Sequence, residues 1–128
     1  MLPNAIEIVT LFVDDLGESK TFYGKVFAPD IVYEDEVSAV LSFSGVMINL
    51  LLLTEARELV EPNSLAAPAA GPRVLLTIRV EDVDASCAAL RSQGVALLNG
   101  PIDRPWGRRT AAFADPSGHV WEVAQELS

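Results

Sequence analysis

Hydrophobic and polar residues alternate along the chain in a pattern that predicts short strands and two amphipathic helices. Residues 6–13 are rich in β-branched side chains and predict a strand. Asp15 follows as a typical helix N-cap, with Glu18 three residues further on. The next residues repeat at helical spacing and predict one buried helix face, made of Ser19, Phe22, Tyr23, Val26 and Phe27. This helix is expected to end at Ala28, because a residue that precedes proline avoids the helical region.

Further short apolar runs, bounded by turn signals, predict the remaining elements. In the first half they predict strands at residues 31–33, 39–43 and 46–53. In the second half they predict a strand at 74–80, a helix at 83–92 capped by Asp82, and strands at 96–98, 110–114 and 119–124.

The two halves of the chain repeat each other. Residues 9–19 align with residues 76–86, and residues 44–50 align in the same order with residues 117–123. Each half therefore predicts a strand, a helix and three strands. We expect an α+β protein with a first βαβββ module at residues 1–54, a linker at 55–72 with one helical turn near residues 55–59, and a second module at 73–128.

Composition and charge narrow the function classes. The chain carries 18 acidic and 9 basic residues, a net charge of −9, which disfavours binding to nucleic-acid phosphates. Its one cysteine, Cys87, cannot form an internal disulfide, and the first residues lack the pattern of a signal peptide. The longest apolar run, residues 46–53, is too short to cross a bilayer. These features predict a cytoplasmic protein that does not bind membranes.

Three segments of the chain carry a family resemblance. They are Val13-Asp14-Asp15-Leu16 with the helix face that follows it, Trp106-Gly107-Arg108-Arg109, and the segment from Asp115 to Glu122. Together they resemble the vicinal oxygen chelate superfamily, which includes glyoxalases, extradiol dioxygenases and bleomycin-resistance proteins. The resemblance implies that the sheets of two βαβββ modules form a curved mixed sheet around a central cleft.

The resemblance also locates four positions at which metal-using members bind a divalent ion through His or Glu. In this chain those positions hold Ile8, Asn49, Leu75 and Glu122. Only Glu122 is a competent ionic ligand, because Ile and Leu have no donor atom and an amide binds weakly. The one histidine, His119, lies beside a predicted turn. The resemblance therefore implies a member that uses no metal and no other cofactor.

Strand alternation predicts which polar and aromatic side chains face the implied cleft. The candidate ligand-binding residues from alternation are Thr10, Phe12, Asn49, Thr77, Arg79 and Glu122. The resemblance adds Trp106 and Arg109, because in the resembled drug-binding proteins the corresponding loop lies at the mouth of the pocket. Glu122 has two interpretations: it holds a ligand cation or acts as a general base, or it forms an ion pair with Arg79 or Arg109. Trp106 could equally anchor a loop, and Phe12 could simply fill the core.

The resulting hypothesis is a metal-independent protein that sequesters an aromatic or cationic small molecule, with antibiotic resistance as one possible role. The alternatives are a glyoxalase-like lyase or dioxygenase with an atypical metal site, and a metal-free catalyst that uses Glu122. Exposed sheet edges favour pairing with another chain and predict a homodimer. The resemblance implies the same, because the resembled proteins commonly build each cleft from two chains.

Overall fold

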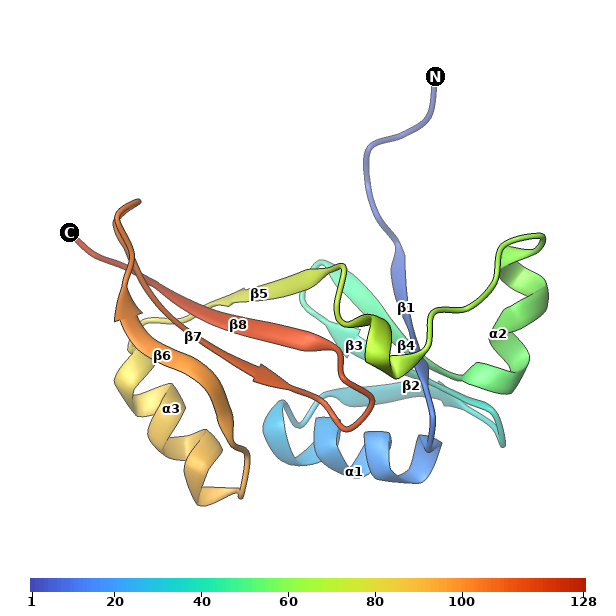
Figure 1. Ribbon diagram of the computed structural model, residues 1–128, viewed down its shortest axis with the longest axis horizontal. Helices are drawn as coiled ribbons and strands as arrows, with labels where there is room; N and C mark the ends of the chain where they lie inside the picture. Colours follow the sequence, from blue (N-terminus) through green and yellow to red (C-terminus); the bar gives the residue numbers. More distant parts are fainter. The chain divides into compact units, whose positions relative to one another are not determined.

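The computed structural model describes all residues, 1–128, and divides them into two compact units, Met1–Ala67 and Pro68–Ser128. Each unit contains one four-stranded mixed sheet with a helix packed along one face (Figure 1). The expected α+β class and its two βαβββ modules are confirmed. None of the helices combines the length and the apolar character needed to cross a membrane.

The first unit follows the predicted order of elements and adds one helix. Its elements are β1 (Ile8–Val13), α1 (Leu16–Val26), β2 (Asp30–Glu34), β3 (Ser38–Phe43), β4 (Val46–Leu52) and α2 (Leu53–Val60). The strands lie in the order β1-β4-β3-β2, with β1 parallel to β4 and the other pairs antiparallel. The first and the last strand of the module are therefore neighbours.

The predicted N-cap of α1 is present, and the predicted buried face is confirmed at Ser19, Phe22 and Tyr23, whereas Val26 and Phe27 are half-buried. A carboxylate oxygen of Asp15 accepts a hydrogen bond from the Glu18 backbone at 2.9 Å, which satisfies one of the free N–H groups of the first turn. The helix buries Leu16, Ser19, Phe22 and Tyr23, and it packs against β3 and β4. Burial of this apolar face is the main stabilisation of so short a helix.

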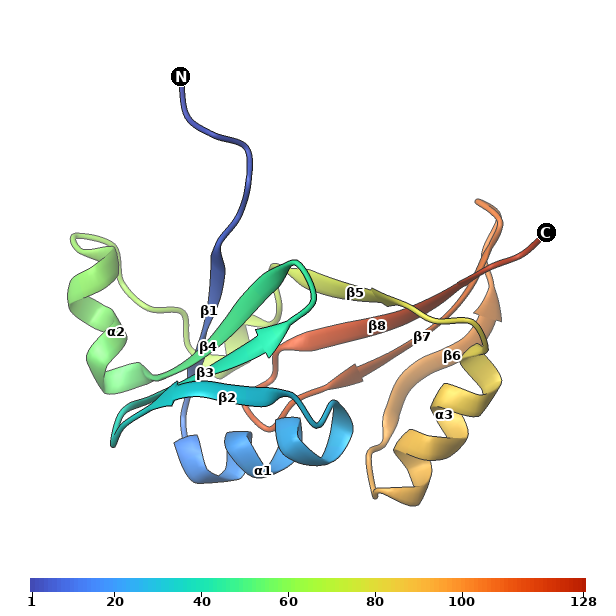
Figure 2. The same cartoon turned by 180° about the vertical axis from the view of Figure 1, so that it is seen from behind.

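The second unit repeats this plan. Its elements are the short 3-10 helix η1 (Pro68–Ala70), β5 (Leu75–Arg79), α3 (Val83–Ser92), β6 (Leu97–Asp103), β7 (Arg108–Ala114) and β8 (Val120–Glu126). The strand order is β5-β8-β7-β6, and β5 is parallel to β8. Asp82 caps α3 through the Ala85 backbone N–H at 3.0 Å. The helix packs against β6, β7 and β8 (Figure 2), and Phe113 of β7 and Trp121 of β8 are buried.

Two elements differ from their predicted extents. Residues 53–60 form α2, which packs against β1 and β4 through the buried Ala56, whereas the sequence predicted a linker from residue 55. Strand β6 continues to Asp103, although Gly100 and Pro101 end the apolar alternation after residue 98. A proline is tolerated there because β6 is an edge strand, and the register shift between Asn99 and Ile102 absorbs the irregular pair.

Replacing Gly100 with alanine is expected to destabilise the second unit strongly. Gly100 has a φ of +87°, and a Cβ there would lie 2.4 Å from the Thr110 carbonyl oxygen and 2.7 Å from the Ala111 Cα. Positive φ and overlap with backbone atoms of β7 together predict a loss of about 3 kcal/mol in the free energy of unfolding. Urea denaturation of Gly100→Ala measures this loss.

Gly94→Ala is the matched control for this substitution. Gly94 has a φ of +78°, but nothing lies within 4 Å of the position of an added Cβ. The free energy of unfolding of Gly94→Ala should therefore fall by about 1 kcal/mol, the cost of the backbone conformation alone. Equal losses for the two variants would show that β6 does not approach β7 as closely as described.

Candidate functional site

The face of the second sheet that points away from α3 carries the polar candidates of this unit. Thr77 pairs with Glu122 in the parallel register of β5 and β8, and Arg79 pairs with Ala124. Alternate residues of a strand point to opposite faces, so Leu76 and Ile78 lie toward the helix. We call the opposite surface the α3-distal face; it carries Leu75, Thr77, Arg79, Asn99, Thr110, Ala112, Val120, Glu122 and Ala124.

Glu122 lies half-buried on this face and is held by a neutral partner. The Thr77 hydroxyl donates a hydrogen bond to Glu122 Oε1 over 3.1 Å. No lysine or arginine forms an ion pair with this carboxylate. The alternative interpretation, an ion pair of Glu122 with Arg79 or Arg109, is therefore not realised in the structure. The carboxylate keeps lone pairs that a donor from outside the chain can use.

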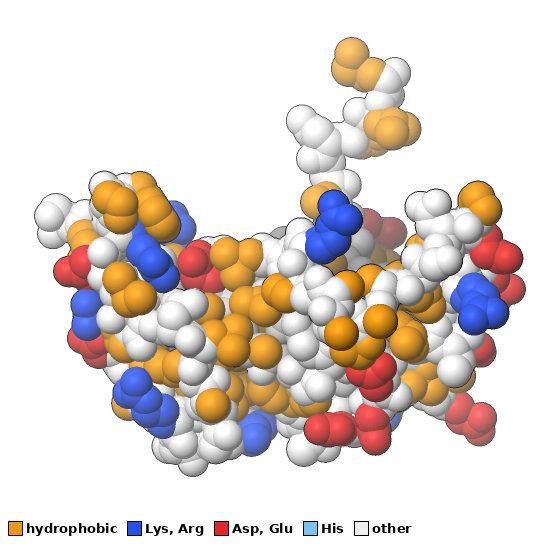
Figure 3. Space-filling model, viewed as in Figure 1, with side chains coloured by type: hydrophobic (Ala, Val, Ile, Leu, Met, Phe, Trp, Pro, Cys, Tyr) orange, Lys and Arg blue, Asp and Glu red, His pale blue; other side chains and the backbone are white.

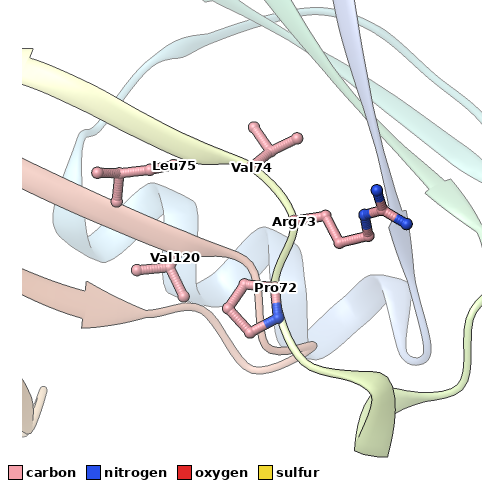
Figure 4. Close-up of a pocket in the computed structure, with 5 residues that line it drawn as sticks. All are labelled: Pro72, Arg73, Val74, Leu75 and Val120. Carbon is pink, nitrogen blue, oxygen red and sulfur yellow. The ribbon is translucent and has the colours of Figure 1, made fainter.

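A shallow, mostly apolar hollow, lined by Pro72, Arg73, Val74, Leu75 and Val120, adjoins the Thr77–Glu122 pair. Leu75 is paired with Val120 in the register of β5 and β8. Leu75 lies two residues before Thr77 and Val120 two residues before Glu122, so all four side chains lie on the same face. Figure 4 shows Leu75 and Val120 side by side with Pro72 next to them, while Arg73 and Val74 point away from Val120. Figure 3 shows hydrophobic side chains gathered over β5 and β8. An apolar surface beside a few directed polar groups is the usual character of a small-molecule site.

The two arginines of the Trp106-Gly107-Arg108-Arg109 segment lie on opposite faces of β7. Arg109 points to the helix side, where it forms ion pairs with Asp84 of α3 at 2.8 Å and with Asp103 at 2.9 Å. Hydrogen bonding to these two carboxylates raises the pKa of the Arg109 guanidinium. Arg109 therefore does not join Glu122 on the α3-distal face as the sequence predicted. Arg108 lies on that face, and it pairs with Glu126 at 2.8 Å.

Arg104 reaches the α3-distal face, although sequence analysis did not select it. Its Nε donates to the buried Thr110 hydroxyl at 2.9 Å, and its Nη2 donates to Asn99 Oδ1 at 3.2 Å. The guanidinium also lies 6.0 Å from the centre of the Trp106 ring. Trp106 itself is 67 % exposed, so it does not serve as a buried loop anchor. Alternation could not place Arg104, because it lies in the turn between β6 and β7.

The first unit carries an equivalent but uncharged pair. Thr10 and Asn49 are register partners on β1 and β4, and the Asn49 amide donates to the Thr10 hydroxyl at 3.4 Å. Asn49 Oδ1 is buried and accepts no hydrogen bond. Phe12 lies on the same strand face as Thr10 and is half-buried. The structure thus reproduces the predicted symmetry of Thr10 with Thr77 and of Asn49 with Glu122.

The residues at the four metal-ligand positions do not fit a divalent ion. Ile8 and Leu75 have no donor atom, and Asn49 already uses its amide N–H toward Thr10. No group of three or more His, Cys, Asp or Glu side chains comes together in the structure. Glu122 is the one residue of the four with a carboxylate, so these positions do not form the His and Glu ligand set of the metal-using members.

The only thiol of the chain is not suited to nucleophilic chemistry. Cys87 is fully buried in α3, and burial raises the pKa of its thiol. A thiol with a raised pKa is protonated at neutral pH and reacts slowly. The chemistry available on the α3-distal face is therefore that of Glu122, Arg104 and the hydroxyl groups beside them.

Comparison with known proteins places the chain in a family. Residues 5–123 match the model of the glyoxalase/bleomycin resistance protein/dioxygenase superfamily. The uncharacterised protein YraH of Bacillus subtilis (strain 168) is 34 % identical over 124 residues, covering 93 % of this chain and 96 % of YraH.

Solved structures agree with this match. A glyoxalase/bleomycin resistance protein/dioxygenase from Nocardioides has a TM-score of 0.87 at 24 % identity, covering 100 % of this chain and 87 % of its own. TnmS3, an antibiotic binding protein from Streptomyces sp. CB03234, has a TM-score of 0.71 at 29 % identity, and 98 % of each chain is covered. The protein with this sequence is a member of the glyoxalase/bleomycin resistance protein/dioxygenase superfamily.

Proposed function

We propose that this protein binds and sequesters a small aromatic or cationic molecule without a metal ion, and that the α3-distal face of the second sheet is part of the binding site. The observation that carries the proposal is the half-buried Glu122 carboxylate, which has a hydroxyl as its partner and no cation, beside an apolar hollow. A ligand cation would supply the missing charge, and an apolar group next to this cation would contact Leu75 and Val120.

Physical chemistry favours a ligand with both features. A partly desolvated carboxylate is stabilised when it pairs with a cation, because this offsets the loss of water. Similarity to an antibiotic binding protein supports the same class of function.

Glu122→Gln is expected to weaken the binding of an aromatic cation. With 4-methylbenzylamine as the probe, isothermal titration calorimetry should give millimolar affinity for the native protein. The substitution removes the charge and keeps the shape, so the affinity should fall by about tenfold, equivalent to about 1.4 kcal/mol. The uncharged analogue 4-methylbenzyl alcohol should bind the native protein and the variant equally.

Glu81→Gln makes the same change of charge at an exposed residue in the turn before α3, and it should leave the affinity for the amine unchanged. The proposed site would be wrong if both variants lowered the affinity equally. It would also be wrong if the alcohol bound as tightly as the amine.

We also propose that the protein forms a homodimer, supported by the exposed edge of the first sheet. Strand β2 is the last strand of that sheet, and its Ile31, Val32 and Tyr33 are 50–56 % exposed. Apolar edge strands of this kind favour pairing with another chain.

Sedimentation equilibrium at micromolar concentration should therefore give the mass of a dimer. A charge on the exposed edge disfavours pairing, so Val32→Lys should shift the equilibrium toward monomer. A monomeric native protein at that concentration would contradict this proposal.

A further inference from the structure

Arg104 is distinguished from the other arginines by its surroundings. Three arginines are half-buried: Arg104, Arg108 and Arg109. The last two form ion pairs with carboxylates, whereas Arg104 binds only the neutral oxygens of Thr110 and Asn99. In a chain with twice as many acidic as basic residues, this half-buried positive charge has no negative partner.

These two hydrogen bonds occupy one of the two edges of the guanidinium that can bind a carboxylate, and they leave the other edge free. Nε and Nη2 donate from one side of the planar group, so two of its five N–H groups are occupied. The Nη1 group and the second N–H of Nη2 remain. These N–H groups form the fork that binds a carboxylate in bidentate fashion. Thr110 and Asn99 also fix the orientation of the fork, which lowers the entropy lost when an anion binds.

Arg104 and Glu122 lie on the same face but form no ion pair with each other. Asn99, Ala112, Glu122 and Thr77 form one row across β6, β7, β8 and β5. Neighbouring strands are about 4.8 Å apart, so Arg104, bound to Asn99, lies roughly two strand spacings from Glu122. The residue between them in this row is Ala112, which is uncharged and 7 % exposed.

We infer that the ligand of this site is amphoteric, with an anionic group that binds Arg104, a cationic group that binds Glu122, and a flat apolar body over Ala112. The inference rests on the proposed function and extends it, because Glu122 alone would select only for a cation. Arg104 thereby acts as a specificity-determining residue. Arg104 and Glu122 both gain an opposite charge only when both ends of the ligand are present.

Three probes of matched shape test this inference by isothermal titration calorimetry. They are the zwitterion 4-(aminomethyl)benzoate, the cation 4-methylbenzylamine and the anion 4-methylbenzoate. The zwitterion should bind the native protein about tenfold more tightly than either singly charged probe. Arg104→Gln should lower the affinity for the zwitterion to that of the amine, without changing the affinity for the amine.

Two further variants complete the design. Arg104→Lys keeps the charge and loses the planar fork, so the affinity for the zwitterion should fall between those of the native protein and Arg104→Gln. It also keeps the test valid if the glutamine variant fails to fold. Arg91→Gln removes a positive charge from an exposed position of α3 and should change none of the three affinities.

The possible outcomes separate the inference from the proposed function. If the zwitterion binds no more tightly than the amine, or keeps its advantage in Arg104→Gln, the amphoteric ligand is wrong. Binding of the amine that still depends on Glu122 would then leave the proposed function intact. If none of the probes binds at millimolar concentration, both the inference and the proposed function are contradicted.

Discussion

The parallel pairing of the first and last strands of each module is the constraint on which the rest of the structure depends. In the second unit, β5 lies beside β8, and their register places Thr77 against Glu122 and Leu75 against Val120. Because side chains alternate between faces, a shift of one residue would turn Glu122 toward α3. The register is fixed by burial of Trp121 and Val123 on the helix side. The polar pair therefore depends on the apolar core behind it.

The helix side of the second sheet stabilises the fold, and this explains how the α3-distal face can hold charges that have no partner of opposite charge. The helix side is closed by apolar burial and by the ion pairs of Arg109, which connect β7 to α3 and to Asp103. The α3-distal face contributes less apolar burial, and its Arg104 and Glu122 are held by hydroxyl and amide groups. Charges oriented by neutral groups stay available to a ligand, whereas charges that are paired within the chain do not.

Much of this arrangement could be predicted from the sequence, for identifiable reasons. The repeat and the strand alternation together placed Thr10, Asn49, Thr77 and Glu122 in equivalent positions. The orientation of Arg109 could not be predicted, because it depends on the register that β7 takes up after the irregular β6. Arg104 was not predicted as a site residue for a related reason: it lies in a turn, where no periodicity indicates the direction of a side chain. Helix α2 formed because Ala56 packs against the sheet, a tertiary contact that local spacing does not reveal.

The central claim is that a ligand binds to the α3-distal face of the second sheet, beside Glu122. Mapping of amide chemical shifts by NMR during titration with 4-(aminomethyl)benzoate tests it most directly, because every backbone position reports separately. The account predicts that the largest shifts occur in β5 and β8, around Thr77 and Glu122, and in the turn that carries Arg104. Largest shifts confined to α3 and the helix side of the sheet would contradict it.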